Sequence, residues 1–268
     1  MIGQNSIHIW RMRLDTLAAL SEVERNSRME SWRPILSAEE QSRADSFRTE
    51  ALRQDYIAAH ATLRFVLGMY LKVLPAIVRI HGAEGTKPAL ANALIGVEGS
   101  PHREQQLDLR FNLSHTRGAV LIGVAVGREI GVDIEWQRPM EDLEAMARSV
   151  MSDEEREFWM MLGPEKRIQA FYWVWTHKES YLKAIGLGLY RSLQDVTVST
   201  SVGGMLGNLE HPHLVLDRAG RGSWMAMDIP AWEGYSAAVC WEGADEPELT
   251  VRDLDISRSE LNEIGKLA

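Results

Sequence analysis

Cysteine is almost absent from this sequence of 268 residues, in which Cys240 stands alone. One thiol cannot form an internal disulfide or a zinc ribbon, and such sparse cysteine is typical of a reducing compartment. Long hydrophobic runs are also absent: the longest, Ala119 to Val126, contains Gly123 and is far shorter than the roughly 20 residues of a membrane span. The N-terminus has no basic segment followed by an apolar one, so we expect no signal peptide and a cytoplasmic protein.

Basic residues are also fewer than acidic ones. The sequence has 29 Lys and Arg against 38 Asp and Glu, a net charge of −9. This sign opposes non-specific binding to nucleic acid or to anionic membranes, so we expect neither as a partner. Any phosphate site must therefore be a local concentration of positive charge. A hydrophobic content of 45% is that of an ordinary globular protein and argues against disorder.

Hydrophobic periodicity predicts the order of the elements. In the first part we expect a strand over 7–14, helices over 37–47 and 49–70, a short strand over 77–80 and a loop over 81–106. Three strands joined by turns short enough for hairpins follow, over 108–114, 119–126 and 130–136. We then expect helices over 141–150, from 152 and over 164–185, the last stopped by Gly186 and Gly188, and strands over 193–198, 213–216, 223–229 and 235–241. Strand, helices and strands thus occur twice, which predicts an α+β fold of two similar halves.

Asp133 and Glu135 are two residues apart in a predicted strand. Their side chains therefore project from one face, while Val132 and Ile134 project from the other. Two carboxylates held this close repel each other unless water separates them or a cation neutralises them, and oxygen ligands suit a hard ion such as Mg²⁺. An ordinary solvated strand face is the alternative interpretation.

The predicted helix over 164–185 is apolar around most of its circumference, so we expect it to be largely buried. Within it, Glu179 and Lys183 are four residues apart and share a face. An i,i+4 ion pair would account for them on an exposed helix. In a buried helix, charged groups usually pair with each other, a metal or a ligand, which makes both residues candidates for a site.

Polar residues gather at the end of the predicted strand over 108–114. Ser114 and His115 could bond to a phosphate, but as strand neighbours they point to opposite faces, which argues against a nucleophilic triad. Lys87 and Pro88 lie in the long loop after Gly85. Taken alone, the loop residues and the arginines of the two early helices are ordinary solvated positions.

Four motifs taken in order closely resemble those of the Sfp-type 4′-phosphopantetheinyl transferases, which are monomers of two halves. They are Gly85-Thr-Lys-Pro88, Phe111-Asn-Leu-Ser-His115, Ile130-Gly-Val-Asp-Ile-Glu135 and Trp175-Thr-His-Lys-Glu-Ser-Tyr-Leu-Lys183. The last two are the specific ones, and the sequence departs from them only in having Thr176 where Ser or Cys is usual. The resemblance covers residues 40–190. It implies pseudo-twofold halves over 1–125 and 126–268, each a small antiparallel sheet with packed helices.

The resemblance also implies a reaction, in which the phosphopantetheine arm of coenzyme A moves to a serine of an acyl, aryl or peptidyl carrier protein and 3′,5′-ADP is released. Such carriers serve fatty-acid, polyketide or nonribosomal-peptide synthesis. By the same resemblance, Asp133, Glu135 and Glu179 match the Mg²⁺ ligands and Glu179 the general base. Lys183 lies near the diphosphate. The positions that match coenzyme A contacts are Ser114, His115, Lys87 and Pro88, with Arg43, Arg53 and Arg64 as possible anchors of the 3′-phosphate.

Two other functions fit the same residues. A metal-dependent nucleotide phosphohydrolase would use these carboxylates with water as the nucleophile, and a non-catalytic module would bind coenzyme A or a carrier without turnover. For the transferase, the charge of −9 excludes global attraction of an acidic carrier, so docking requires a local patch. The segment from Met140 to Met151, near the turn at Arg117, is the predicted location of that patch. The alternative interpretation is that the methionines of this segment fill the core.

Overall fold

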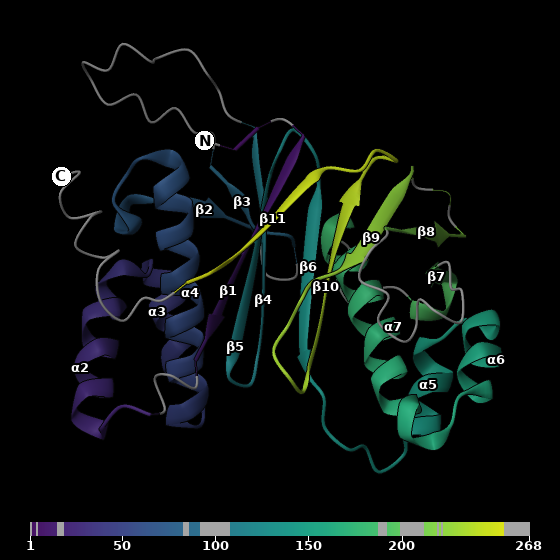
Figure 1. The fold of residues 1–268 in the computed structure, drawn as a ribbon. Coiled ribbons are helices and arrows are strands. Elements are labelled where there is room, and N and C mark those ends of the chain that lie inside the picture. The colour runs from purple at the N-terminus through teal and green to yellow at the C-terminus, as the bar shows by residue number, and fades with distance from the viewer. Residues whose placement is uncertain are drawn as a thin grey trace.

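Two β-sheets face each other, and each carries helices on its outer side (Figure 1). The computed structural model describes residues 2–3, 5–14, 19–82, 86–91, 108–186, 192–198, 212–218, 220 and 222–254. The first sheet has the strand order β11-β1-β5-β4 and the second β6-β10-β9-β8-β7. Their strands are β1 (Ser6–Arg13), β4 (Leu109–Thr116), β5 (Ala119–Val126), β6 (Ile130–Trp136), β7 (Val196–Val198), β8 (His213–Asp217), β9 (Trp224–Asp228), β10 (Tyr235–Glu242) and β11 (Glu248–Asp253).

The helices fall into two groups, one on each outer side (Figure 1). The first sheet is covered by α2 (Glu22–Trp32), α3 (Ala38–Asp45) and α4 (Glu50–Leu71), and the second by α5 (Leu143–Val150), α6 (Asp153–Met161) and α7 (Pro164–Ile185). Short elements complete the described chain: 3₁₀ turns over Arg33–Ile35, Pro75–Ile77 and Leu193–Asp195, and the pair β2 (Ile80–His81) and β3 (Ala89–Leu90). No helix among the described residues is both long and apolar enough to cross a membrane.

Side-chain alternation explains why the layers stack in this order. Along β5, Val120, Ile122 and Val124 pack with the helices of the first group, whereas Leu121 and Ala125 pack against the second sheet. Both faces of the strand are covered, so all eight of its residues are buried. The core between the sheets is completed by apolar residues of β6 and β10. The mixed α+β architecture predicted from the sequence is thus present.

Most predicted elements are found close to their expected bounds. The helix α7 spans 164–185 as predicted, and Gly186 ends it with φ 72°, in the left-handed conformation that suits glycine. Gly188, Gly85 and most of the predicted loop after residue 91 lie outside the described residues. The proposed strand over 77–80 is wrong, because a 3₁₀ turn begins at Pro75 and only a two-residue strand follows it.

Two further expectations were wrong, and two elements were not predicted. The strands β5 and β6 do not pair as a hairpin but belong to different sheets. The first sheet is not purely antiparallel, because β1 pairs in parallel with β11. Helix α2 and strand β11 were missed, although Ser21 and Glu24 form a capping box at the start of α2. Because β11 pairs with β1, the first sheet contains a strand from the second half of the sequence. The predicted division into halves over 1–125 and 126–268 remains a prediction.

Candidate active site

The strand β6 brings Asp133 and Glu135 to the face that packs on α7. Its other face carries Val132 and Ile134 into the core between the sheets, as the alternation predicts. Gly131 makes the close approach possible, because a Cβ at this position would lie 2.0 Å from the carbonyl oxygen of Ser180. The backbone of α7 therefore lies directly against the strand, one turn or less from Glu179 and Lys183.

Lys183 joins the helix to both sheets. Its Nζ donates to Asp133 Oδ1 at 2.6 Å and to Ser114 Oγ at 2.8 Å, and Ser114 Oγ also donates to Asp133 Oδ1 at 2.9 Å. Asp133 is 2% exposed, so this ion pair is shielded on the side of the carboxylate. No ion pair between Glu179 and Lys183 is found among the described residues, and the i,i+4 pairing is therefore not what places these two charges.

Two buried carboxylate oxygens at this site have no hydrogen-bond partner among the described residues: Asp133 Oδ2 and Glu179 Oε1. Burial and the nearby Asp133 raise the pKa of Glu179 above its ordinary value. The same two causes raise the pKa of Glu135 to about 7, although Thr116 donates a hydrogen bond to it at 3.3 Å. Negative charge is therefore concentrated here beyond what Lys183 compensates, which is the electrostatic condition for binding a cation.

The residue types suit Mg²⁺, because all three groups offer oxygen ligands. The three do not form a closed cluster: the one described group of three His, Cys, Asp or Glu residues whose ligand atoms all lie within 4.8 Å of one another is elsewhere. Mg²⁺ does not need a closed cluster, since it usually keeps several waters and binds through one or two carboxylates and the phosphates of a substrate. The unpartnered oxygens of Asp133 and Glu179 fit such a site.

His115 lies beside this cluster. Its ring is accessible to water but has protein on most sides, and this environment lowers its pKa to about 4, helped by the neighbouring charges of His60 and Lys183. His60 stacks on Tyr56 with ring centroids 4.0 Å apart, and Arg43 acts electrostatically on Tyr56. These groups lie between Lys183 and the exposed Arg43 on α3, with the carboxylate of Glu40 beside His60 and Tyr56.

The other two predicted arginines are engaged within the protein. Arg64 is 2% exposed, and its guanidinium donates to Glu40 at 2.7 Å and to the carbonyl oxygen of Val78 at 2.8 Å. Arg53 forms an ion pair with Glu50, one turn earlier on the same helix. These contacts favour a structural role for Arg64 and a surface role for Arg53.

Lys87 and Pro88 line a pocket of about 670 Å³ at the end of α7. The side chain of Lys87 is engaged within the protein, because its Nζ donates to Glu129 at 2.5 Å, to the carbonyl oxygen of Ile130 at 2.8 Å and to that of Ala184 at 2.9 Å. It thus links the loop to β6 and α7. Lys178 is likewise structural: it is fully buried and forms a 2.5 Å ion pair with Glu155.

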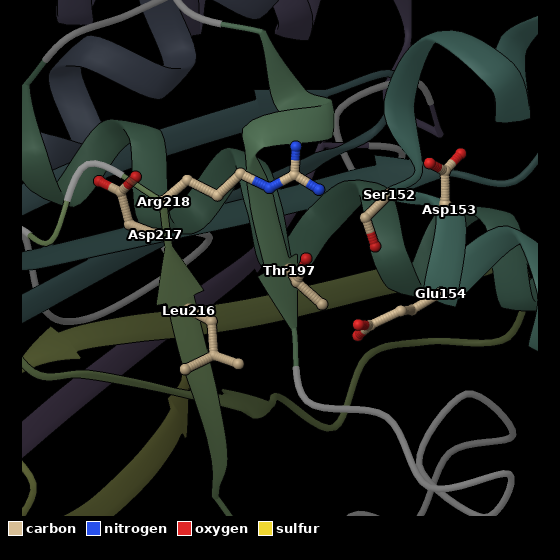
Figure 2. Close-up of a pocket in the computed structure, with 7 residues that line it drawn as sticks. All are labelled: Ser152, Asp153, Glu154, Thr197, Leu216, Asp217 and Arg218. Carbon is tan, nitrogen blue, oxygen red and sulfur yellow. The ribbon is translucent and has the colours of Figure 1, made fainter.

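A second pocket, of about 420 Å³, lies between the start of α6 and the strands β7 and β8 (Figure 2). It is lined by Ser152, Asp153, Glu154, Thr197, Leu216, Asp217 and Arg218, none of which belongs to the predicted site. The predicted docking patch for a carrier is wrong in part: Met151 is 2% exposed, and Met146 packs against the core around α5 and α7. Met151 therefore fills the interior, whereas Met146 is only partly buried.

Comparisons with known proteins point to one family. The family model of the 4′-phosphopantetheinyl transferase superfamily matches residues 129–240, which include β6 and α7. The 4′-phosphopantetheinyl transferase HetI of Nostoc sp. is 32% identical over 195 residues, covering 73% of this chain and 74% of that protein. The 4′-phosphopantetheinyl transferase psf-1 of Bacillus pumilus is 26% identical, with 70% and 74% covered.

A solved holo-(acyl-carrier-protein) synthase from Bacillus anthracis, in complex with CoA (3′,5′-ADP), also aligns with the chain. The TM-score is 0.34 and the sequence identity 18%, over 42% of this chain and 94% of that one. This likeness is too distant to locate individual residues, so the assignment depends on the sequence relatives.

Proposed function

The chain belongs to the 4′-phosphopantetheinyl transferases, and from this we propose that it moves the 4′-phosphopantetheine arm of coenzyme A to a serine of an acyl, aryl or peptidyl carrier protein. The observation that carries the proposal is the contact of Lys183 with Asp133 and Ser114 beside the unpartnered oxygen of Glu179. Transfer of a phosphoryl group needs positive charge at the diphosphate and a base for the attacking hydroxyl. These side chains offer both.

The reaction exchanges one P–O bond for another. The serine oxygen of the carrier bonds to the phosphorus that bears the pantetheine, and the bond from that phosphorus to the bridging oxygen breaks. The electron pair leaves with 3′,5′-ADP, and the serine proton passes to a base. Glu179 suits this role because burial and the nearby Asp133 raise its pKa, which makes it a better proton acceptor.

Asp133, Glu135 and Glu179 would hold a Mg²⁺ ion, which when bound would neutralise charge on the diphosphate and orient it. Lys183 adds a fixed positive charge on the same side, and the hydroxyl of Ser114 and the ring of His115 lie near Lys183 and would contact phosphate oxygens bound there. Lys183 and the residues that would hold the ion would therefore both act on the diphosphate.

We assign two contacts to the remaining part of coenzyme A. We place the adenine at the pocket of about 670 Å³ beside Pro88, since that pocket opens next to the end of α7. For the 3′-phosphate, we favour Arg43 over Arg53 and Arg64, because Arg43 is exposed and lies towards Tyr56 and His60, whereas Arg64 is buried against Glu40. The carrier is not identified by any of these contacts.

The test is to incubate the protein with coenzyme A, Mg²⁺ and a panel of apo acyl, aryl and peptidyl carrier proteins and to measure the intact mass of each carrier. We expect one carrier or more to gain the mass of one phosphopantetheine arm. Asp133→Asn and Glu179→Gln should each lose at least about 100-fold in rate, since each removes a charged group from the transition-state contacts. Asp153→Asn, which changes an exposed carboxylate on α6, is the matched control and should behave as the wild type.

The outcomes separate the alternatives. Cleavage of coenzyme A without a gain in carrier mass would indicate a phosphohydrolase. Binding of coenzyme A without either product would indicate a non-catalytic module. Full turnover by Glu179→Gln with intact folding would exclude Glu179 as the base while leaving the transferase assignment in place.

A further inference from the structure

A second cluster of ligand-type side chains lies on the far side of α7 from the candidate active site. It consists of His177 on α7, His213 at the start of β8 and Asp228 at the end of β9. One potential ligand atom of each lies within 4.8 Å of those of the other two. His177 precedes Glu179 by two residues, which on a helix is about 200° of rotation, so the two side chains point in nearly opposite directions.

His177 is oriented as a ligand. Its Nδ1 lies 2.8 Å from the carbonyl oxygen of Trp173, and because a carbonyl can only accept, Nδ1 carries the proton and donates. Its Nε2 then has a free lone pair. The residue is 0% exposed, and this nitrogen has no hydrogen-bond partner among the described residues. Histidines that bind metals almost always donate their other ring N–H to a carbonyl or a carboxylate in this way.

Asp228 is oriented by the same tryptophan. Trp173 Nε1 donates to Asp228 Oδ2 at 3.0 Å, so one carboxylate oxygen is held in place. The carboxylate is 6% exposed, and burial raises its pKa to about 6. Among the described residues, His213 acts on this carboxylate electrostatically and opposes the rise in its pKa. Trp173 therefore positions both His177, through its carbonyl, and Asp228, through its ring.

We propose that His177, His213 and Asp228 bind a divalent transition-metal ion of the Zn²⁺ class. Two imidazoles and one carboxylate suit Zn²⁺ and disfavour Mg²⁺, which prefers oxygen ligands throughout. Three protein ligands would leave a fourth position for water. His213 is half-buried and is the most exposed of the three. The ion would connect α7 to β8 and β9 and so restrain the helix that carries Glu179 and Lys183 on its other face.

The test uses Co²⁺ as the probe and the full-length protein without a polyhistidine tag, freed of metal by a chelator that is then removed. We expect one Co²⁺ per chain with the visible absorption of tetrahedral coordination, displaced by one equivalent of Zn²⁺ but not by excess Mg²⁺. Asp228→Asn keeps the shape of the side chain and an acceptor for Trp173, yet should weaken Co²⁺ binding at least about 100-fold. His213→Gln should do the same from a half-buried position.

Two controls separate this site from the acidic cluster around Asp133. Asp133→Asn should leave the tetrahedral Co²⁺ spectrum unchanged, and Zn²⁺ should raise the melting temperature of this variant as it does in the wild type, because ligands that bind the folded state stabilise it. Neither response should occur in Asp228→Asn or His213→Gln. The proposal is overturned if the metal-free protein binds no stoichiometric Co²⁺ with the tetrahedral spectrum, or if either folded variant binds Co²⁺ with wild-type affinity and spectrum.

Discussion

Glu40 holds two helices of the first group together through its two carboxylate oxygens. Oε2 accepts from the backbone N–H of Ser37 and from Arg64 Nε, both at 2.7 Å, and Oε1 lies 3.2 Å from His60 Nδ1. Burial alone would raise its pKa, but these hydrogen bonds and the charge of Arg64 outweigh burial and lower the pKa of Glu40 to about 2. The ionised form is therefore the one that the folded protein stabilises.

The change Glu40→Gln tests whether the ionised carboxylate of Glu40 stabilises the folded protein. Since the pKa in the folded state is below that in the unfolded state, the contribution of Glu40 is fully present above about pH 4.5 and is lost as the pH falls towards 2. We expect Glu40→Gln to lower the free energy of unfolding by about 3 kcal/mol at pH 7, because the charge of Arg64 is left buried without a carboxylate beside it. The stability curves of variant and wild type should converge near pH 2 in denaturant titrations.

Glutamine preserves the capping box of α3, so loss of the helix cap does not complicate this comparison. The adjacent Glu39→Gln is the control, because Glu39 is exposed and should change stability by less than about 0.5 kcal/mol. Parallel pH profiles for Glu40→Gln and wild type would contradict the role given to Glu40.

Single residues show where sequence reasoning reaches its limit. The spacing of Asp133 and Glu135 and the apolar surroundings of Glu179 and Lys183 were enough to single out these positions, because alternation and helical period follow from local geometry. The pairing of Lys183 with Asp133 was not predictable, since it joins residues 50 apart. The burial of Arg64 against Glu40 was also missed, because it arises from the packing of α3 on α4.

The strands β4 and β6 lie side by side without the backbone hydrogen bonds of a sheet. Side-chain oxygens of β4 accept the hydrogen bonds that backbone carbonyls would accept in a sheet, and we call this contact the seam. The backbone N–H groups of Val132, Ile134 and Trp136 donate to side-chain oxygens of β4, every second residue along the strand. The acceptors are Asn112 Oδ1, Ser114 Oγ and Thr116 Oγ1, at 2.9, 3.3 and 3.5 Å. Because of this seam, β5 and β6 do not form a hairpin. Strand β6 belongs to the second sheet and lies beside β4, which belongs to the first.

We expect Asn112→Ala to lower the free energy of unfolding by about 1–3 kcal/mol, because it leaves the N–H of Val132 buried without an acceptor. Thr116→Ala is the matched change at the more exposed end of the seam, where the bond is longer and water can replace it, and should cost less than about 1 kcal/mol. Denaturant unfolding of both variants provides the measurement. If both variants lose the same unfolding free energy, the loss comes from shortening the side chain and not from the buried hydrogen bond of the seam.

Gly131 controls the distance between β6 and α7. A Cβ there would lie 2.0 Å from the carbonyl oxygen of Ser180 and 2.4 Å from the backbone nitrogen of Ala184, so Gly131→Ala must push the helix outward. We expect a loss of stability of about 1–3 kcal/mol or more. Transfer activity should fall further than stability explains, because Glu179 and Lys183 move away from Asp133.

The control is Gly127→Ala, in the turn between β5 and β6. Gly127 has φ 69° and no atom within 4 Å of a Cβ, so alanine there costs backbone strain of about 1–2 kcal/mol but displaces nothing. Rates measured well below the melting temperature of each variant should separate the two effects. Wild-type turnover in folded Gly131→Ala would contradict the requirement for close packing of α7 on β6.

Elements with strong local signals were predicted well, and elements defined by partners were not. The capping box at Ser152, the proline at position 164 and Gly186 mark the bounds of α6 and α7 directly in the sequence. The short strand β7 was predicted too long, because residues 193–195 form a 3₁₀ turn. Which strands pair depends on contacts between distant segments, and local periodicity carries no information on that point.

At the scale of the whole molecule, β11 returns from the second sheet to the first and pairs in parallel with β1 (Figure 1). Leu249 and Val251 of this strand pack against the core between the two sheets. Without β11, the strand β1 would present an open edge with unpaired N–H and C=O groups, and such edges favour association with other chains. The two halves of the sequence are therefore joined by more than the single connection between β5 and β6.

The last prediction concerns this closing strand. A chain that ends at residue 247 lacks β11, whereas a chain that ends at residue 254 retains it and serves as the reference. We expect the shorter chain to lose several kcal/mol of unfolding free energy, of the order of 25 cal/mol for each Å² of apolar surface left uncovered. It should also associate through the open edge of β1, which sedimentation would detect as a concentration-dependent increase in mass. If the shorter chain stays monomeric and unfolds like the reference, the first sheet does not depend on β11, and a half that ends near residue 125 could fold by itself.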